Sequence, residues 1–281
     1  MGIRTDLAVE WMESGEAMPD NLRREQSMVE GMECIRVTQP DGGIYLTLSL
    51  DSLLRREQES FARACRAVAA QLRELASGLS GQAPVLVIGL GNRAVTPDAI
   101  GPLCCQSVLA TRHLLRTEPV VHGLRPVSVL APGVLGTTGV ETGEIVRGLM
   151  ENIRPELVLA VDALAARRMR RLMRTIQLTD TGIVPGSGVG NARAALTQKE
   201  LGVPVIAVGV PTVIDTATIA EEISEQTHTD CEALEDLNTP SIVTTRDVDR
   251  QVADAARVIG YGINLFLHPM LRLTDIDAFL D

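Results

Sequence analysis

Aromatic side chains are scarce in this sequence, which has one Trp, two Tyr and three Phe among 281 residues. Proteins that bind single-stranded nucleic acid stack its bases on aromatic rings, and a net charge of -10 repels the phosphate backbone. We therefore expect no direct binding of nucleic acid. The core must be filled by Val, Leu, Ile and Ala, which suits a parallel sheet covered by helices on both faces.

Histidine, cysteine and long apolar runs are scarce as well. Four His are too few for a multi-histidine metal site, and the five Cys show no CxxC or metal-binding spacing, so we expect no metal and no cofactor. Unpaired thiols are typical of the reducing cytoplasm. The sequence shows no signal-peptide pattern and no apolar run of membrane-spanning length, which predicts a cytoplasmic protein that does not bind a membrane.

The N-terminal third of the sequence shows no strand–helix alternation. Residues 1–30 are polar with little periodicity, so we expect them to lie along the surface. Turn residues separate two alternating runs, Glu33–Thr38 and Gly43–Ser49, which predicts a hairpin. Apolar residues at helical spacing then predict a helix over Ser52–Leu79.

From Pro84 onward, short apolar runs alternate with helical patterns. This rhythm predicts a single α/β domain with an open, doubly wound, mostly parallel sheet and helices on both faces. Residues 228–246 are acidic and weakly patterned, which favours a loop. The strands are expected at Val85–Leu90, Val127–Leu130, Leu157–Val161, Thr175–Leu178 and Pro204–Val208, and the helices at Thr96–Leu115, Gly143–Ile153, Ala163–Met173, Ile214–Ser224 and Asp247–Leu267.

Ligands of such sheets bind outside the carboxyl ends of the strands, so the residues that follow each strand are the candidates for a site. Asp98 follows the first of these strands and Asp162 follows the third. Either acid alone could be a helix cap or a first-turn acid, but on adjacent strand ends the two could form a close pair. Further candidates for the cleft lining are Asn92, Thr96, Asp180, Thr181 and Asp215.

Two carboxyl groups within hydrogen-bonding reach share a proton, because both cannot ionise cheaply. The ionised member can take a proton from water, while the protonated member polarises a carbonyl group. Asp98 and Asp162 are the best pair in the sequence for this chemistry, which is that of a peptidase.

Three other motifs favour weaker interpretations. Gly89–Ala94 matches the GxGxxA dinucleotide pattern, but the next strand is not followed by an acid that could bind a ribose. Asp180–Gly182 resembles the triplet of pepsin-like proteases, which are all-β and need two copies, so a structural turn is expected. Gly186–Asn191 is glycine-rich without the lysine of a P-loop, and it could be a flexible loop or a lid over substrate.

A cluster of five arginines gives one stretch of this negatively charged protein a local positive charge. One interpretation is a solvated helix face, and the other is contact with an acidic partner or subunit. The cluster consists of Arg167, Arg168, Arg170, Arg171 and Arg174.

Six segments of the sequence resemble the spore germination protease family, and all but the first span most of residues 84–219 in the family's order. They are Ile3–Glu10 (IRTDLAVE), Gly89–Pro102 (GLGNRAVTPDAIGP), Arg125–Gly143 (RPVSVLAPGVLGTTGVETG), Val161–Arg167 (VDALAAR), Thr175–Asn191 (TIQLTDTGIVPGSGVGN) and Val203–Asp215 (VPVIAVGVPTVID).

The resemblance implies a fold similar to that of the hydrogenase maturation peptidases and an endopeptidase that degrades small acid-soluble spore proteins during germination. It also implies a homotetramer in the developing spore and spore core. The family's two catalytic aspartates match Asp98 and Asp162. Arg93 departs from the Trp that relatives often carry there, and the stretch after Ser224 is shorter than in the longer relatives.

Two alternatives stay open. The first is a metal-dependent peptidase of the maturation type on the same fold, with Asp98 and Asp162 as ligands. The second is a non-enzymatic module that binds a nucleotide at Gly89–Ala94.

The family resemblance also implies a zymogen that removes its own N-terminal segment. It further implies that substrates are cut after Glu in a sequence like Thr-Glu-(Phe/Ile)-Ala-Ser-Glu. Thr5–Glu10 is similar. We therefore predict self-cleavage between Asp6 and Leu7, with residues 1–6 as a short prosegment and residues 7–281 as the peptidase domain. Mass spectrometry of protein incubated at mildly acidic pH should show the loss of residues 1–6, and an unchanged N-terminus would contradict the prediction.

Overall fold

The computed structural model describes residues 5–11, 22–117, 123–186, 194–227 and 241–280. One sheet runs through these residues in the strand order β1-β2-β3-β7-β8-β6-β4-β5, with β9 paired to β8. The strands are β1 (Arg23–Val29), β2 (Met32–Thr38), β3 (Ile44–Ser49), β4 (Val85–Gly89), β5 (Val127–Leu130), β6 (Leu157–Ala165), β7 (Thr175–Thr179), β8 (Val205–Asp215) and β9 (Ile242–Val243).

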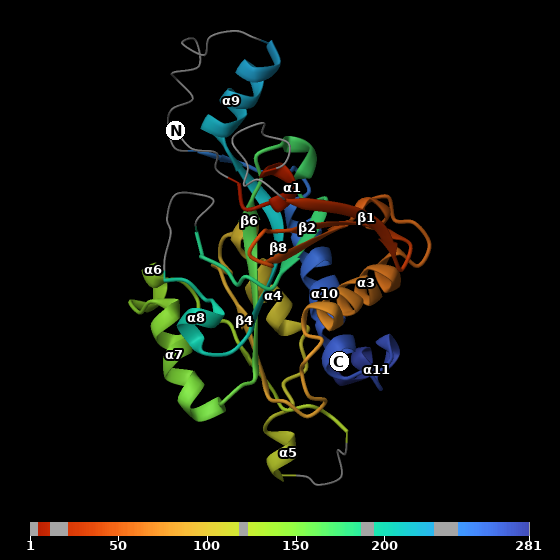
Figure 1. The fold of residues 1–281 in the computed structure, drawn as a ribbon, viewed down its shortest axis with the longest axis vertical. Helices are drawn as coiled ribbons and strands as arrows, with labels where there is room; N and C mark the ends of the chain where they lie inside the picture. Colours follow the sequence, from red (N-terminus) through yellow and green to blue (C-terminus); the bar gives the residue numbers. More distant parts are fainter. Residues whose placement is uncertain (1–4, 12–21, 118–122, 187–193, 228–240, 281) are drawn as a thin grey trace.

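Helices cover both faces of this sheet, as the sequence predicts (Figure 1). They are α1 (Ala8–Trp11), α2 (Asp51–Leu54), α3 (Ser60–Leu75), α4 (Ile100–Gln106), α5 (Leu114–Thr117), α6 (Leu135–Thr138), α7 (Thr142–Ile153), α8 (Gln198–Leu201), α9 (Thr216–Thr227), α10 (Val248–Leu267) and α11 (Leu273–Leu280), together with two 3₁₀ turns, η1 (Thr96–Asp98) and η2 (Met169–Arg171).

The parallel part of the sheet consists of β8, β6, β4 and β5. Its strands are apolar on both faces because helices pack against both. Val87 and Leu159 point toward α3, α4 and α10, whereas Leu86 and Val158 point toward α7 and α8. Figure 1 shows this sheet nearly edge on, with α7 and α8 on its left and α3 and α10 on its right. The predicted α/β class is confirmed.

The predicted N-terminal hairpin is confirmed as β2 and β3, and it is part of the same sheet. β3 pairs antiparallel with β7, and β7 pairs antiparallel with β8, so the hairpin extends the parallel part at one side. Strand β1, which pairs with β2 along its whole length, was not predicted. Its residues are largely exposed, so it lacks the apolar alternation that would reveal a strand.

The predicted helix over 96–115 is wrong beyond Gln106. The turn η1 comes first, and α4 then ends near Ser107. A buried carboxamide from α10 ends it: Asn264 Nδ2 donates to the Ser107 carbonyl at 2.7 Å, and the Leu109 N–H donates to Asn264 Oδ1 at 2.9 Å. These tertiary hydrogen bonds replace the next helical turn, and no local pattern reveals them.

The predicted helix over 163–173 is also wrong. β6 continues through Ala165 because its pairing with β8 continues there, with Asp162 opposite Gly209 and Ala163 opposite Val210. Likewise β8 runs to Asp215, so the helix expected from Ile214 begins as α9 two residues later. Most of the predicted loop over 228–246, and most of Gly186–Asn191, lie outside the described residues.

The arginine cluster does not form a solvated helix face, because the chain after β6 is irregular apart from η2. Arg167 is buried. Arg168 pairs with Glu222 of α9 at 3.2 Å, and Arg174 pairs with Asp51 at 2.8 Å. At least two of the five charges are therefore paired within the chain.

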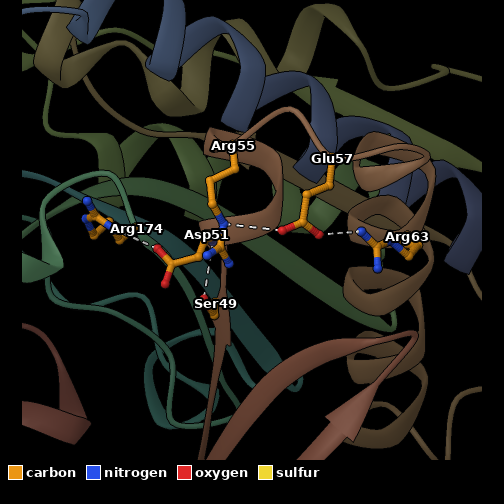
Figure 2. A network of polar contacts seen from close by, with 6 residues as sticks. All are labelled: Ser49, Asp51, Arg55, Glu57, Arg63 and Arg174. Atoms are coloured by element: carbon orange, nitrogen blue, oxygen red, sulfur yellow. Dashed lines mark hydrogen bonds and ion pairs between the residues drawn. The ribbon is translucent and has the colours of Figure 1, made fainter.

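Figure 2 shows the exposed network that joins Arg174 to the start of α2. The Asp51 N–H also donates to Ser49 Oγ, and Glu57 pairs with Arg55 at 3.3 Å and with Arg63 at 3.1 Å. Exposed ion pairs of this kind each contribute roughly 1 kcal/mol or less. The network therefore fixes the path of the chain after β3 more than it stabilises the fold.

The long helix α10 is the centre of the packing on its side of the sheet, between α3 and α4. It approaches both through glycines: a Cβ on Gly260 would lie 2.6 Å from the Cβ of Ser107, and one on Gly262 would lie 2.6 Å from Cγ1 of Val68. Among the described residues, no helix is both long and apolar enough to cross a membrane.

We predict that Gly262→Ala destabilises the protein by about 1–3 kcal/mol, because overpacking against Val68 outweighs the better helix propensity of alanine. The matched control is Gly148→Ala in α7, where an added Cβ meets nothing within 4 Å. That variant should gain up to about 1 kcal/mol. Urea unfolding of both variants measures the difference, and equal effects in the two helices would contradict the packing.

Candidate active site

A cleft of about 750 Å³ lies at the carboxyl end of β4, beside the second halves of β6 and β8. It therefore lies where strand topology places ligand sites in open α/β sheets. Apolar side chains form part of its rim: Val95, Val184 and Ile242 are all exposed and all line it. Both predicted catalytic acids, Asp98 and Asp162, line this cleft.

Asp162 comes from the interior of β6 and is only 6% exposed. Its Oδ1 accepts a hydrogen bond from the Ala163 N–H at 2.9 Å. Burial raises the pKa of Asp162 well above its ordinary value, the negative charges of Asp98 and Asp6 raise it further, and the Ala163 hydrogen bond opposes the shift. Asp162 is therefore a carboxyl group that holds its proton to an unusually high pH.

Asp98 comes from the turn η1, which packs against β6 and β8. The carboxyl group is half-buried, and its Oδ2 accepts a hydrogen bond from the Asn92 N–H at 2.8 Å. The Asp98 N–H donates to the Val95 carbonyl at 2.8 Å. Backbone groups of the loop after β4 therefore hold the Asp98 side chain toward the cleft.

Glycines bring the Asp98 turn close to the strand ends. Gly91 has a φ of +107°, and a Cβ there would lie 2.0 Å from the Asp98 carbonyl oxygen. A Cβ on Gly101 would lie 2.3 Å from the Leu90 carbonyl oxygen, and one on Gly89 would lie 2.2 Å from the Gly101 carbonyl oxygen. The glycines of the GxGxxA match thus accommodate neighbouring backbone. They do not form a phosphate cradle at a helix N-terminus.

The N-terminal segment Thr5–Glu10 begins in the cleft, where Thr5 and Asp6 are lining residues. The Asp6 N–H donates to the Ala165 carbonyl at 3.1 Å, and the Ala165 N–H donates to Asp6 Oδ2 at 2.9 Å. The next residues, Leu7 and Ala8, are fully buried. One backbone hydrogen bond and one hydrogen bond to the Asp6 side chain therefore hold Asp6 at the end of β6, and helix α1 begins two residues later at Ala8.

Glu10 anchors the other end of this segment. It is 1% exposed and accepts hydrogen bonds from the N–H groups of Arg167 at 2.6 Å and Arg168 at 2.8 Å, and from the Thr5 hydroxyl. Burial raises the pKa of Glu10, and these hydrogen bonds oppose the shift. The two arginine N–H groups fix the segment against the chain that follows β6, and the Thr5 hydroxyl joins the two ends of the segment.

A model of the germination protease family matches residues 8–227. The germination protease of Caldanaerobacter subterraneus subsp. tengcongensis is 40% identical over 100% of this chain and 98% of its own length. That of Clostridium acetobutylicum is 38% identical over 99% of both. That of Bacillus pumilus is 42% identical over 78% of this chain and 66% of its own length.

This chain belongs to the germination protease family. It is a peptidase, a hydrolase that acts on peptide bonds. The predicted family is thus confirmed, and the matched range contains both acids of the cleft.

The other residues predicted for the cleft lie in different places. Thr181 lines it, and its hydroxyl lies 3.0 Å from the Tyr45 hydroxyl. Asp180 holds the hairpin instead, because its Oδ1 accepts from the Ile44 N–H. Asp215 accepts from the Ala217 N–H at the start of α9. Asn92, Thr96, Asp180 and Asp215 are not among the described residues that line the cleft.

Gln177 and Thr179 of β7 line the cleft and were missed by the sequence analysis. Both are buried polar residues in a strand. The sequence T-I-Q-L-T of β7 alternates apolar and polar positions, and this is the signal that one face of the strand meets something other than a helix. It does not reveal that the polar face lies beside Asp162.

Other nucleophiles and metal ligands are poorly placed in the described part of the chain. Burial raises the pKa of the Cys105 thiol to about 12 and that of Cys34 to about 11, so neither is a thiolate at neutral pH. Among the described residues, no three His, Cys, Asp or Glu side chains form a group suited to a metal ion. His122 lies outside the described residues.

We predict that Asp162→Asn stabilises the fold at neutral and alkaline pH. An acid whose folded-state pKa is raised loses stability as pH rises through that pKa, because the folded state must then bury its charge. Asparagine removes the charge and keeps an oxygen for the Ala163 N–H. The gain should be on the order of 1 kcal/mol near pH 8 and shrink toward pH 4.

Thermal unfolding across this pH range measures the effect. Asp41→Asn, on the exposed turn of the hairpin, is the control for the removal of one negative charge. A gain for Asp162→Asn that does not change with pH would contradict the prediction.

Proposed function

We propose that this protein is an endopeptidase that initiates the degradation of small acid-soluble spore proteins during germination, and that Asp98 and Asp162 activate its water nucleophile. We propose further that it is made as a zymogen that cleaves itself between Asp6 and Leu7. The observation that carries the proposal is that Thr5 and Asp6 line the same cleft as both aspartates. The residue on one side of the bond to be cut thus lies in the cleft that holds both acids.

The two aspartates have different roles in this proposal. Asp162 is the buried member with the raised pKa, so it holds the shared proton and polarises the carbonyl group of the bond to be cut. Asp98 is the more exposed member and accepts an N–H from Asn92, so it carries the negative charge and takes a proton from water. Activity should therefore fall as pH rises through the pKa of Asp162.

The bound N-terminal segment also supports inhibition of the zymogen despite its short length. Thr5 and Asp6 occupy part of the cleft and are held there by Ala165 and Glu10. Removal of residues 1–6 frees that part of the cleft, leaving residues 7–281 as the peptidase domain. The spore-protein substrate, the homotetramer and the location in the spore core are inferred from the family resemblance.

We predict that Asp98→Asn and Asp162→Asn, tested separately, each slow self-cleavage at the Asp6–Leu7 bond by at least about 100-fold, because each removes one proton-transfer group. Wild-type cleavage should be first order and independent of protein concentration, since each chain's own segment lies in its own cleft. The measurement is intact-mass spectrometry over time at mildly acidic pH.

The matched control is Asp180→Asn, which keeps an oxygen acceptor for the Ile44 N–H and should leave the rate within about twofold. A folded Asp98 or Asp162 variant with near wild-type turnover would overturn the two-aspartate mechanism. Exhaustive chelation should leave the wild-type rate unchanged, and a loss that one divalent metal restores would instead favour the metal-dependent peptidase.

A further inference from the structure

Gln177 binds the backbone of the N-terminal segment on both sides of the Asp6–Leu7 bond. Its Nε2 donates to the Asp6 carbonyl oxygen at 2.7 Å, and its Oε1 accepts from the Ala8 N–H at 2.7 Å. Only one orientation of the carboxamide satisfies both partners, since a carbonyl needs a donor and an N–H needs an acceptor. The Gln177 side chain therefore spans the bond that is proposed to be cut.

The sheet register places Gln177 and Asp162 on the same face. Gln177 of β7 lies opposite Gly209 of β8, and Asp162 of β6 lies opposite the same Gly209. Residues that are in register on neighbouring strands point to the same side of a sheet, so the two side chains flank a position without a side chain, with their Cα atoms roughly 10 Å apart. The side chain of Leu164 covers that position, since a Cβ on Gly209 would lie 2.5 Å from Leu164 Cγ.

The core fixes the strand that carries Gln177. Gln177 is 5% exposed, and its neighbours in β7, Ile176 and Leu178, pack in the core on the opposite face. A buried donor aimed at a carbonyl oxygen stabilises the negative charge that develops there when water attacks, because no solvent has to reorganise. Both hydrogen bonds are made to backbone groups, the second at the first residue of α1, so this recognition does not depend on the side chains of Asp6 and Ala8.

We propose that Gln177 binds the peptide that is cleaved and stabilises the oxyanion that develops on it. Its Nε2 donates to the carbonyl oxygen of the bond that is cut, and its Oε1 accepts from the N–H two residues later. This inference rests on the proposed cleavage of the Asp6–Leu7 bond. It adds a third group to the aspartate pair and names a peptide backbone as the ligand.

The test compares first-order rates of self-cleavage in the full chain. Gln177→Met keeps the size of the side chain and loses both hydrogen bonds, so its rate should fall about 100-fold. Gln177→Glu keeps the acceptor for Ala8 and loses the donor when ionised. Its rate relative to wild type should therefore be low near neutral pH and rise toward one as the pH falls, because a protonated glutamate donates again.

The matched control is Thr175→Val, two residues earlier on the same face of β7, where the buried hydroxyl has no hydrogen-bond partner among the described residues. Its rate should stay within about twofold of wild type. Thermal unfolding of each variant verifies that it is folded.

The outcomes separate the two proposals. Normal cleavage by folded Gln177→Met, or a Gln177→Glu rate ratio that does not change with pH, overturns the role of Gln177 while the peptidase proposal stands. No cleavage of the wild-type Asp6–Leu7 bond overturns self-processing and the Gln177 inference with it. A pH-dependent return of activity in Gln177→Glu is not expected of a purely structural residue.

Discussion

The carboxyl group of Asp162 is buried within a strand that is hydrogen-bonded on both sides, and the arrangement of the cleft depends on that burial. β4 and β8 cover the edges of β6, and the turn that carries Asp98 approaches closely enough for its charge to raise the pKa of Asp162. That approach needs glycine, because a Cβ at Gly91 or Gly101 would collide with backbone. A buried acid beside a second acid is costly to ionise, and a raised pKa of this kind is frequent at functional sites.

The antiparallel part of the sheet completes the site. β7 joins the hairpin to the parallel strands and brings a polar face, with Gln177 and Thr179, beside the carboxyl end of the parallel part. The N-terminal segment then lies across this junction, held by hydrogen bonds to β6, β7 and the chain after β6. The hairpin therefore does more than extend the sheet, because it positions the strand that contacts the bound peptide.

Much of this fold could be predicted from local patterns. The buried strands, the hairpin and the two-sided helical cover follow from apolar periodicity. The boundaries at Gln106 and Ala165 could not, because each is set by a partner distant in sequence: Asn264 ends α4, and β8 extends β6. The exposed strand β1 could not be predicted either, since pairing with β2 and not burial makes it a strand.

For the site, the sequence by itself indicated the two acids near the carboxyl ends of two parallel strands, and its motifs determined the germination protease family. The place of each acid after an apolar run can be read along the chain, so Asp98 and Asp162 could be chosen from it, whereas only the fold sets β4 beside β6. Only the tertiary structure decided that Asp6 and Gln177 join them and that Asp162 is the one deprived of water. Burial and contacts between residues 6, 162 and 177 depend on which segments pack together, and no local spacing encodes that.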